Sequence, residues 1–357
     1  MKSGKTLSQL AAELDRQNQV KKDFLASTGS ISMSVSDNDP DIDYANRPKL
    51  VIDGIGAFGI GDTTHQQIAQ RISIPQKYYD RMRHDAPALL ATNVNHWMHK
   101  NTERRMIRTM DGTARAFLSD KYRALDNYDL AQAVLPVLQE APEIRIESAE
   151  ITDRRMYIKA IFPRMEGEIT KGDIVKSGLV ISNSEIGHGS LRVEPLLYRL
   201  VCLNGLIANT SMKKYHVGRH SNDMDAAYEI YQDETRKADD RAFWLKVQDI
   251  VRASLSDAQF KKVIESAQRA AGMLIQDSPV EVVNRAAAHF NLTDGEAGGI
   301  LTHLIQGGDL SAWGLANAFT RHSQDVSDYE RATDFERLGG QIIELPRRDW
   351  ETLAVAA

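Results

Sequence analysis

The sequence predicts an α+β protein: a central antiparallel sheet built from hairpins with an inserted helix, a helical N-terminal segment and a helical C-terminal region. Residues 104–220 contain three successive strand-rich units, the first with Asp111-Gly112 between two extended runs. An Asp-Gly pair in that position indicates a hairpin, because both central residues of its turn need positive φ. Helical periodicity prevails before and after these units, and this order of elements is typical of an α+β fold.

The N-terminal segment predicts a helix and a linker. Four residues within 5–25 recur at helical spacing, namely Leu7, Leu10, Ala11 and Leu14. Residues 28–47 are polar, acidic and poor in apolar residues, which is typical of a flexible linker. We therefore expect residues 1–47 to form an arm and linker, with the helix packing on a neighbouring subunit. A frayed terminus is the alternative.

Residues 48–221 predict the α+β core. Four glycines interrupt an apolar run at residues 49–61, but their spacing matches neither the dinucleotide fingerprint nor a Gly-Lys-Ser/Thr phosphate loop. Turns or a bulge explain these glycines better. Residues 62–100 have helical patterning, and Asp126 is placed to cap a helix that runs to about residue 139.

Residues 222–357 predict a helical C-terminal region. A long helix is expected around residues 223–254, and Ser256 can cap the next one. Residues 292–315 have the length of a helix–turn–helix, yet the second helix carries no cation to face DNA. This pattern favours helical packing over DNA recognition.

The distribution of charge matters more than its sum. The net charge of −5 argues against a wholly basic nucleic-acid binder, but residues 100–220 hold 19 Lys and Arg against 15 Asp and Glu. A mildly basic centre between acidic flanks is able to bind a polyanion locally. Random scatter of the charges is the alternative.

The compartment predicted from the sequence is the cytoplasm. No apolar stretch approaches the roughly 20 residues needed to span a bilayer, and the first residues lack the apolar core of a signal peptide. The single cysteine, Cys202, excludes an intramolecular disulfide. It lies in an apolar run, and we expect it to be a small buried hydrophobe.

Histidine pairs suggest metal sites only weakly. His96 and His99 are three residues apart on one face of an expected helix. His216 and His220 are flanked by lysine and arginine, which disfavours a cation and favours a phosphate. The sequence therefore predicts neither a metal site nor a cofactor.

Catalytic chemistry has one weak candidate. Ser182, Ser184, Glu185 and His188 place hydroxyls, a carboxylate and an imidazole along one segment. Nucleophile, base and acid normally converge from separate elements, so Ser and Asn side chains that satisfy the backbone of this loop are the preferred interpretation. The sequence predicts no catalytic residue.

Several stretches resemble the phage- and plasmid-borne family known as domain of unknown function 932. They are residues 72–97, 112–127, 154–163, 178–205 and 309–332, and include the run Val180-Ile-Ser-Asn-Ser-Glu-Ile-Gly-His-Gly-Ser. The resemblance implies no settled activity. It implies a context of mobile elements, often near recombination and anti-restriction genes.

The leading hypothesis is a phage- or mobile-element-encoded protein that binds and anneals single-stranded DNA in recombination. Such proteins need no catalytic residue and form homo-oligomeric rings or filaments that hold the strand by its phosphates. The candidate contacts are Arg104, Arg105, Arg108, Lys121, Tyr122, Arg123, Arg154, Arg155, Tyr157, Lys159, Lys213, Lys214, Tyr215 and Arg219. Their tyrosines are expected to stack on bases.

Two other functions remain open. The acidic flanks suit a protein that binds a host or phage partner, for example an inhibitor of a defence or restriction enzyme. An enzyme acting on nucleotides or nucleic acids would have Glu185 and His188 as its candidate residues.

Overall fold

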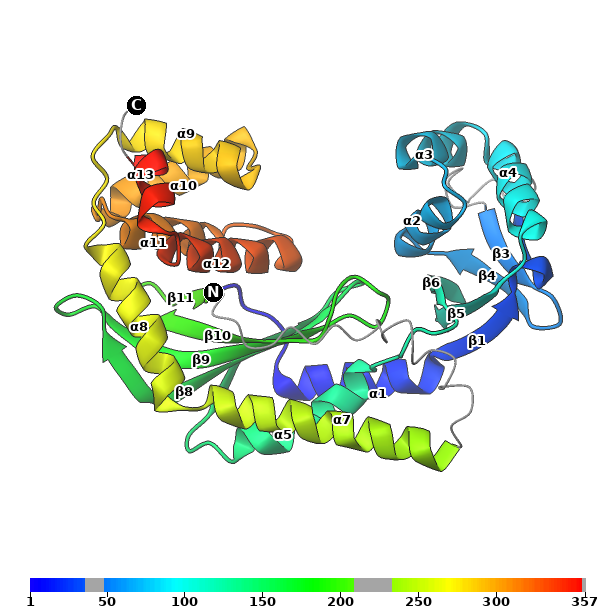
Figure 1. Ribbon diagram of the computed structural model, residues 1–357, viewed down its shortest axis with the longest axis horizontal. Helices are drawn as coiled ribbons and strands as arrows, with labels where there is room; N and C mark the ends of the chain where they lie inside the picture. Colours follow the sequence, from blue (N-terminus) through cyan, green and yellow to red (C-terminus); the bar gives the residue numbers. More distant parts are fainter. Residues whose placement is uncertain (36–47, 209–232, 355–357) are drawn as a thin grey trace.

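The computed structural model describes residues 1–35, 48–208 and 233–354 of the chain. Within these residues two sheets and their surrounding helices form an α+β fold with helices at both ends, which confirms the predicted fold class. In Figure 1 the N-terminal sheet and its helices stand on the right and the C-terminal helices on the left. The second sheet lies below the C-terminal helices and extends from there toward the N-terminal sheet.

The N-terminal sheet, as far as the chain is described, has six strands in the order β1-β5-β6-β4-β3-β2. They are β1 (Lys22–Ser27), β2 (Ile31–Val35), β3 (Pro48–Ile52), β4 (Gly56–Ile60), β5 (Arg104–Met110) and β6 (Thr113–Ser119). β4 and β6 are parallel, and the other neighbours are antiparallel. Asp111 and Gly112 join β5 to β6 with φ of 50° and 75°, which confirms the predicted hairpin.

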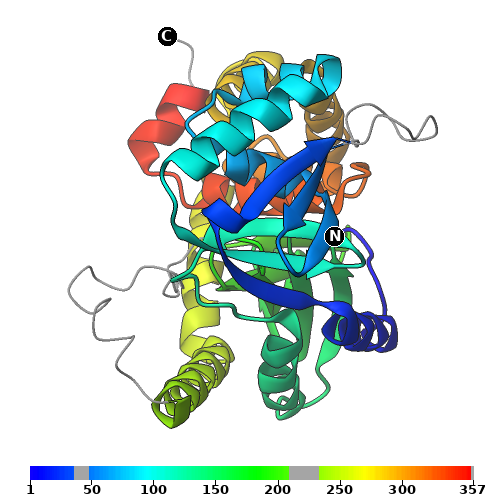
Figure 2. The same cartoon turned by 90° about the vertical axis from the view of Figure 1, so that its right-hand side faces the viewer.

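Three helices cover one face of this sheet. They are α2 (Asp62–Arg71), α3 (Gln76–Asp85) and α4 (Pro87–Lys100). Tyr79 of α3 packs in one core with Leu50 and Ile107 of the sheet, and Figure 2 shows the helices above the strands. At the edge strand β2 the side-chain amide of Asn95 bonds the backbone of Met33, accepting from its nitrogen at 2.7 Å and donating to its oxygen at 2.9 Å. This contact covers an edge that would otherwise be open to another chain.

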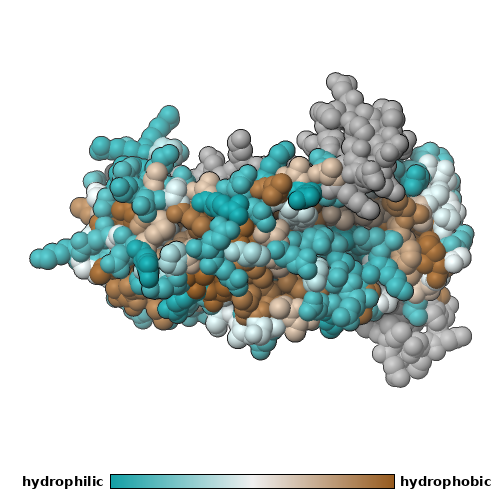
Figure 3. Space-filling model, turned by 90° about the horizontal axis from the view of Figure 1, so that it is seen from below, coloured by the Kyte–Doolittle hydropathy of each residue, from teal (hydrophilic) through white to brown (hydrophobic). Residues whose placement is uncertain are grey.

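The second sheet is an antiparallel meander in the order β11-β10-β9-β8-β7. Its strands are β7 (Arg145–Ile151), β8 (Met156–Glu168), β9 (Ile174–Asn183), β10 (Arg192–Arg199) and β11 (Asn204–Ile207). One face packs against α1 (Leu7–Val20), α5 (Asn127–Gln139) and α7 (Asp233–Ser254). Ile158 of β8 shares this core with Val134 of α5 and Val247 of α7. Seen from below, the surface in the middle of the molecule has hydrophobic residues interspersed with hydrophilic ones (Figure 3). Asp126 occupies the N-cap of α5, as predicted.

The N-terminal helix packs on the core of its own chain, so the prediction of an arm that packs on a neighbouring subunit is wrong. Leu10 and Leu14 are buried in the core beneath α5. Just before the helix, the backbone nitrogen of Lys5 donates to the carbonyl of Ala149 on β7 at 2.6 Å. The predicted linker is also wrong in its first part, because β2 and the 3₁₀ turn Thr28–Ser30 occupy it. The rest of that linker lies outside the described residues.

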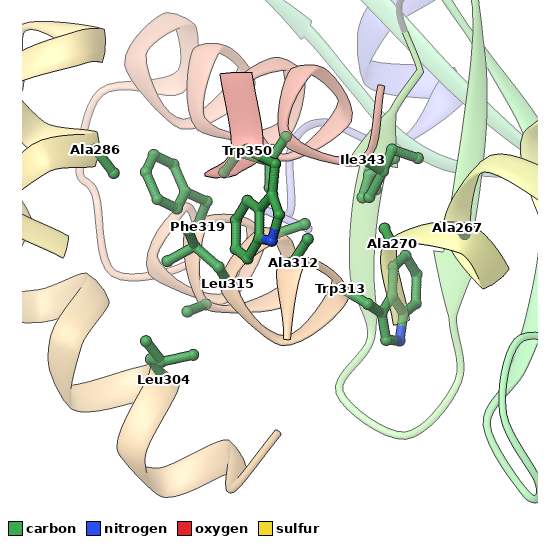
Figure 4. Packing of buried hydrophobic residues seen from close by; sticks show 14 of the residues in the cluster. Ala267, Ala270, Ala286, Leu304, Ala312, Trp313, Leu315, Phe319, Ile343 and Trp350 are labelled. Carbon is green, nitrogen blue, oxygen red and sulfur yellow. The ribbon is translucent and has the colours of Figure 1, made fainter. Parts of the chain in front are cut away.

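The C-terminal region is helical, as predicted. It contains α8 (Asp257–Ala271), α9 (Pro279–Phe290), α10 (Asp294–Gly307), α11 (Ala312–His322), α12 (Tyr329–Ile343) and α13 (Arg347–Ala354). Trp313, Phe319 and Trp350 lie among the buried residues of its core (Figure 4). The burial of Trp313 confirms that α11 is a packing helix.

The helix α12 covers the second face of the five-stranded sheet. The approach is close: a Cβ at Gly340 would lie 1.8 Å from the carbonyl oxygen of Ile207 on β11. Both faces of this sheet are therefore covered by helices. Beyond β10, Cys202 is only partly buried and accepts a hydrogen bond from Arg199 at 3.4 Å, so the expected buried cysteine is wrong.

Candidate functional site: an arginine-lined cleft

Arg108 on β5 is completely buried, although the sequence places it on a surface that would face a polyanion. Two of its nitrogens donate to the carboxylate of Asp23 at 2.9 and 3.0 Å, and one of these also reaches Asp126 at 2.6 Å. The third donates to the backbone carbonyl of Glu185 at 2.9 Å. Arg108 is thus wrong as a DNA contact, because the loop that carries Glu185 and Ile186 packs on this face of the N-terminal sheet.

Lys159 and Tyr157 on β8 are also wrong as surface contacts. The Lys159 ammonium donates to Glu336 at 2.6 Å and to Thr333 at 3.1 Å, and neither Lys159 nor Glu336 has any exposed side-chain area. Burial lowers the pKa of Lys159. Tyr157 is 1% exposed and packs on the ring of Tyr329, 5.5 Å between centroids, and burial raises the pKa of Tyr157 to about 12. The physical reason is α12, which covers this face.

Arg123 and Tyr122 attach the segment after β6 to other parts of the chain. Arg123 forms ion pairs with Asp239 and Asp240 on α7. The hydroxyl of Tyr122 donates to the carbonyl of Ser184 at 3.3 Å. Both side chains therefore have structural partners.

The other predicted cations do not gather on one face. Arg105 pairs with Glu103, whereas Arg104 and Lys121 are exposed. Four predicted residues lie outside the described part of the chain: Lys213, Lys214, Tyr215 and Arg219.

Arg154 and Arg155 are presented by a tight turn between β7 and β8. The hydroxyl oxygen of Thr152 accepts from the backbone nitrogens of Arg154 and Arg155 at 3.2 and 3.0 Å. The backbone nitrogen of Thr152 donates to the carbonyl of Arg155 at 2.8 Å. This local bonding is a common use of threonine in turns, and it fixes the backbone from which both arginines project.

The two arginines line both of two adjoining pockets. The larger, of about 530 Å³, lies between the two sheets, and the smaller, of about 270 Å³, lies beside α12. In the larger pocket α1 contributes Arg16, the start of α2 contributes Asp62 and Thr63, and β6 contributes Arg115. The smaller pocket is completed by Tyr157, His188, Arg192, Glu330, Asp334 and Arg337. We refer to the two pockets together as the arginine cleft.

Most arginines of the cleft have carboxylate partners. Arg16 pairs with Asp111 at 2.9 Å, Arg115 with Glu185, and Arg337 with Glu194 at 2.9 Å. Within the described residues, neither Arg154 nor Arg155 lies within 4.0 Å of a carboxylate oxygen.

Arg155 is surrounded by charges of both signs. Burial lowers its pKa, and Arg192 and Arg337 act in the same direction, whereas Tyr157 and Glu330 oppose the shift. Burial also lowers the pKa of His188, and Arg154 and Arg155 add to this. Burial is the larger cause of both shifts, and repulsion from the neighbouring arginines is the smaller one. Carboxylates such as Asp153, Glu330 and Asp334 also line the two pockets, so any excess of positive charge is confined to the immediate surroundings of Arg154 and Arg155.

The Ser182–His188 segment is structural, as preferred from the sequence. Ser184 Oγ accepts from the backbone nitrogens of Ile186 and His188 at 3.4 and 3.0 Å. Glu185 is buried, and its carboxylate accepts from the backbone nitrogen of Asn127 at 2.6 Å. The ring of His188 bonds Thr63 at 2.8 Å rather than a serine. These contacts build the loop, and among the described residues none of them joins Ser182 or Ser184 to the ring of His188.

A group of possible metal ligands occurs elsewhere than the histidine pairs of the sequence. His99 hydrogen-bonds the carbonyl of Ile31 at 2.9 Å. Instead His303, His322 and Asp325 converge, with one ligand atom from each within 4.8 Å of the others. Sequence reasoning missed them because they come from α10, α11 and the turn after α11.

The cleft also contains residues that sequence reasoning did not select. Arg192 lies in the third strand-rich unit of residues 104–220, so its position in a predicted strand was a signal that could have identified it. Arg337 is one of two arginines on an amphipathic helix, and nothing in the neighbouring sequence distinguishes it.

Comparison with known proteins gives one match. The sequence model of a family described as Domain of unknown function (DUF932) matches residues 114–338, which confirms the resemblance seen in the sequence. The matched part includes Arg154, Arg155 and the three possible metal ligands. No curated protein and no solved structure matches the chain. Among the described helices, none has the length and apolar character required to cross a membrane.

Proposed function

We propose, from the premise that this chain belongs to the family Domain of unknown function (DUF932), that it binds single-stranded DNA through the arginine cleft. The observation that carries the proposal is the pair Arg154 and Arg155, which face both pockets without a carboxylate partner among the described residues. One guanidinium nitrogen of Arg155 donates to the carbonyl of His188, but no carboxylate neutralises either arginine among the described residues. Guanidinium groups bind phosphate oxygens in a bidentate manner, so two such cations side by side suit a phosphate backbone.

The size of the cleft favours a single strand over a duplex. Pockets of about 530 and 270 Å³ fall near the range of small-ligand sites, roughly 300–1,000 Å³. Pockets of this volume accommodate a few groups of an extended strand and are too small to hold a double helix. Because Tyr157 is buried, binding here relies on phosphates rather than on base stacking, and little sequence preference is expected.

The biological setting belongs to the same proposal. Strand annealing in the recombination of a phage or mobile element would use a sequence-independent contact of this kind. Annealing also needs several chains, in a ring or filament, and the N-terminal helix does not supply that contact because its apolar residues are buried internally.

The test is a titration of a fluorescent oligonucleotide at three salt concentrations. Arg154→Ala/Arg155→Ala should weaken binding about tenfold or more and flatten the salt dependence by roughly 0.7 per lost phosphate contact. A matched control is Arg145→Ala/Arg164→Ala, which removes the same charge from exposed sites on β7 and β8, the two strands joined by the turn that carries Arg154 and Arg155. Equal losses in both double variants would show a general charge effect, and a folded wild type that binds no strand at low salt would overturn the proposal.

A protein partner remains the second candidate, for example a host defence or restriction enzyme that this chain inhibits. The turn between β10 and β11 favours it, because Val201 and Leu203 are 68% and 57% exposed. Exposed apolar groups that lie together often mark a protein contact. The DNA titration separates the two functions, since this turn is not part of the cleft.

A further inference from the structure

Three polar side chains of the C-terminal region meet without a role in the arginine cleft. His303 lies on α10, His322 is the last residue of α11, and Asp325 follows in the next turn. One ring nitrogen of each histidine and one carboxylate oxygen lie within 4.8 Å of one another. His303 Nε2 is already 2.6 Å from Asp325 Oδ2.

The His322 ring is held in place by its surroundings. It lies edge-on to Phe335 with ring centroids 4.9 Å apart. On α10, a Cβ at Gly299 would come within 2.5 Å of His322 Nδ1, so the glycine makes room for the imidazole. A ring fixed in this way loses little conformational freedom on binding a ligand.

His322 also carries an unexplained polar atom. Its Nδ1 is shielded from solvent and has no hydrogen-bond partner in the described part of the chain. A buried ring nitrogen without a partner is costly, and a bound ion is one of the few arrangements that explain such an atom.

Asp325 is oriented by a neighbouring cation. Its Oδ1 accepts from Arg321 at 3.1 Å, which leaves Oδ2 directed at His303. Outer partners of this kind commonly orient the carboxylates that bind metals. Arg321 also places a positive charge nearby, which lowers the affinity expected for a cation without blocking Oδ2.

We propose that His303, His322 and Asp325 bind a divalent transition-metal ion of the Zn²⁺ type. Imidazole nitrogen and carboxylate oxygen are ligands of Zn²⁺, and three protein ligands leave one coordination position for water or another ligand. With Zn–ligand distances of about 2.0–2.2 Å, ligand atoms of a tetrahedral site are roughly 3.3 Å apart. Small rotations of the His303 and Asp325 side chains toward the fixed His322 ring would close the present separations of up to 4.8 Å, and the ion would replace the His303–Asp325 hydrogen bond.

The first test measures metal binding by the full chain directly. Protein freed of metal by a chelator and dialysis is titrated with Zn²⁺ by calorimetry, and Co²⁺ is added in parallel to record the visible absorption of a four-coordinate site. The wild type should bind one ion per chain at this site. His216→Gln/His220→Gln, which removes a different pair of closely spaced histidines, should leave this binding unchanged.

Two ligand variants keep the volume of the side chains they replace. His303→Gln and Asp325→Asn should each weaken Zn²⁺ binding at least tenfold, and should abolish the rise in melting temperature that Zn²⁺ gives the wild type. The matched control, His289→Gln, changes an exposed histidine on α9 and should bind as the wild type does. A folded wild type that binds no Zn²⁺, or ligand variants that bind it unchanged, would overturn the proposal.

A glycine pair tests the site without removing a ligand. Gly299→Ala places a methyl group against the His322 ring and should weaken Zn²⁺ binding. Gly298→Ala is the control, because its Cβ would meet no atom within 4 Å. Equal Zn²⁺ affinity in the two folded variants would contradict the assigned position of His322. These measurements do not depend on DNA binding, so failure of the metal-site proposal would leave the proposal for the arginine cleft untouched, and the reverse also holds.

Discussion

Replacing Lys159 by methionine removes the cation of a buried ion pair and leaves its carboxylate in place. Glu336 would lose the ammonium that now lies 2.6 Å from its Oε2, while its Oε1 already has no partner among the described residues. Neither side chain has exposed area, so water does not replace the lost contact. Breaking one partner of such a pair typically costs about 3–5 kcal/mol, and we expect the free energy of unfolding to fall by this amount.

A double variant separates the charge from the packing. Lys159→Met/Glu336→Leu removes both charges and keeps an apolar chain in each position, so its free energy of unfolding should lie within about 1 kcal/mol of wild type or above it. Chemical denaturation of the wild type, both single variants and the double variant gives the coupling energy of the pair. The measurement uses the cooperative loss of helical circular dichroism at neutral pH.

Two results would refute this reasoning. A Lys159→Met protein within about 1 kcal/mol of wild type would show that Glu336 does not need the cation, contrary to its burial. A double variant that is stable but binds single-stranded DNA less tightly would make Lys159 a DNA contact, although α12 covers it. We expect instead that its affinity for the strand is unchanged.

Two further predictions concern the N-terminal helix α1 and the helix α10 of the C-terminal region. Leu10→Ala should lower the free energy of unfolding by about 2–5 kcal/mol in a denaturant melt, because the side chain is fully buried within its own chain; a loss of oligomer mass at unchanged stability would instead favour the intersubunit arm. Hydrogen bonding to Arg331 lowers the pKa of Glu296 to about 2. The carboxylate therefore stabilises the fold above about pH 4.5, and this contribution disappears as the pH falls toward 2. Glu296→Gln should flatten the dependence of melting temperature on pH in this range, and an unchanged profile would contradict the assignment.

Local signals in the sequence were sufficient for much of the secondary structure. Asp111-Gly112 predicted the hairpin because few residues adopt two successive positive φ angles. Asp126 predicted the start of α5, and the apolar spacing of Leu10 and Leu14 predicted α1. These features depend on residues a few positions apart, which the sequence displays directly.

The candidate sites were only partly predictable. Arg154 and Arg155 were selected as members of a strand predicted over residues 154–163, whereas the structure places them in the turn before β8, where they line the cleft. Arg337 comes from a helix more than 180 residues later in the sequence. His303 and Asp325 are 22 residues apart on different elements. Only the packing of these segments brings the side chains together.

The sequence by itself determined that β8 is a strand with alternating long polar and apolar residues, and that helices follow the sheet. It did not determine which face of β8 would meet water, because that depends on where α12 packs. The tertiary structure buried Lys159 beneath α12 and paired it with Glu336, whereas Arg155, on the same strand unit, stayed at the cleft. The sequence around a strand cation is the same whether water hydrates the cation or a distant carboxylate neutralises it. Only the tertiary structure decides between these two environments.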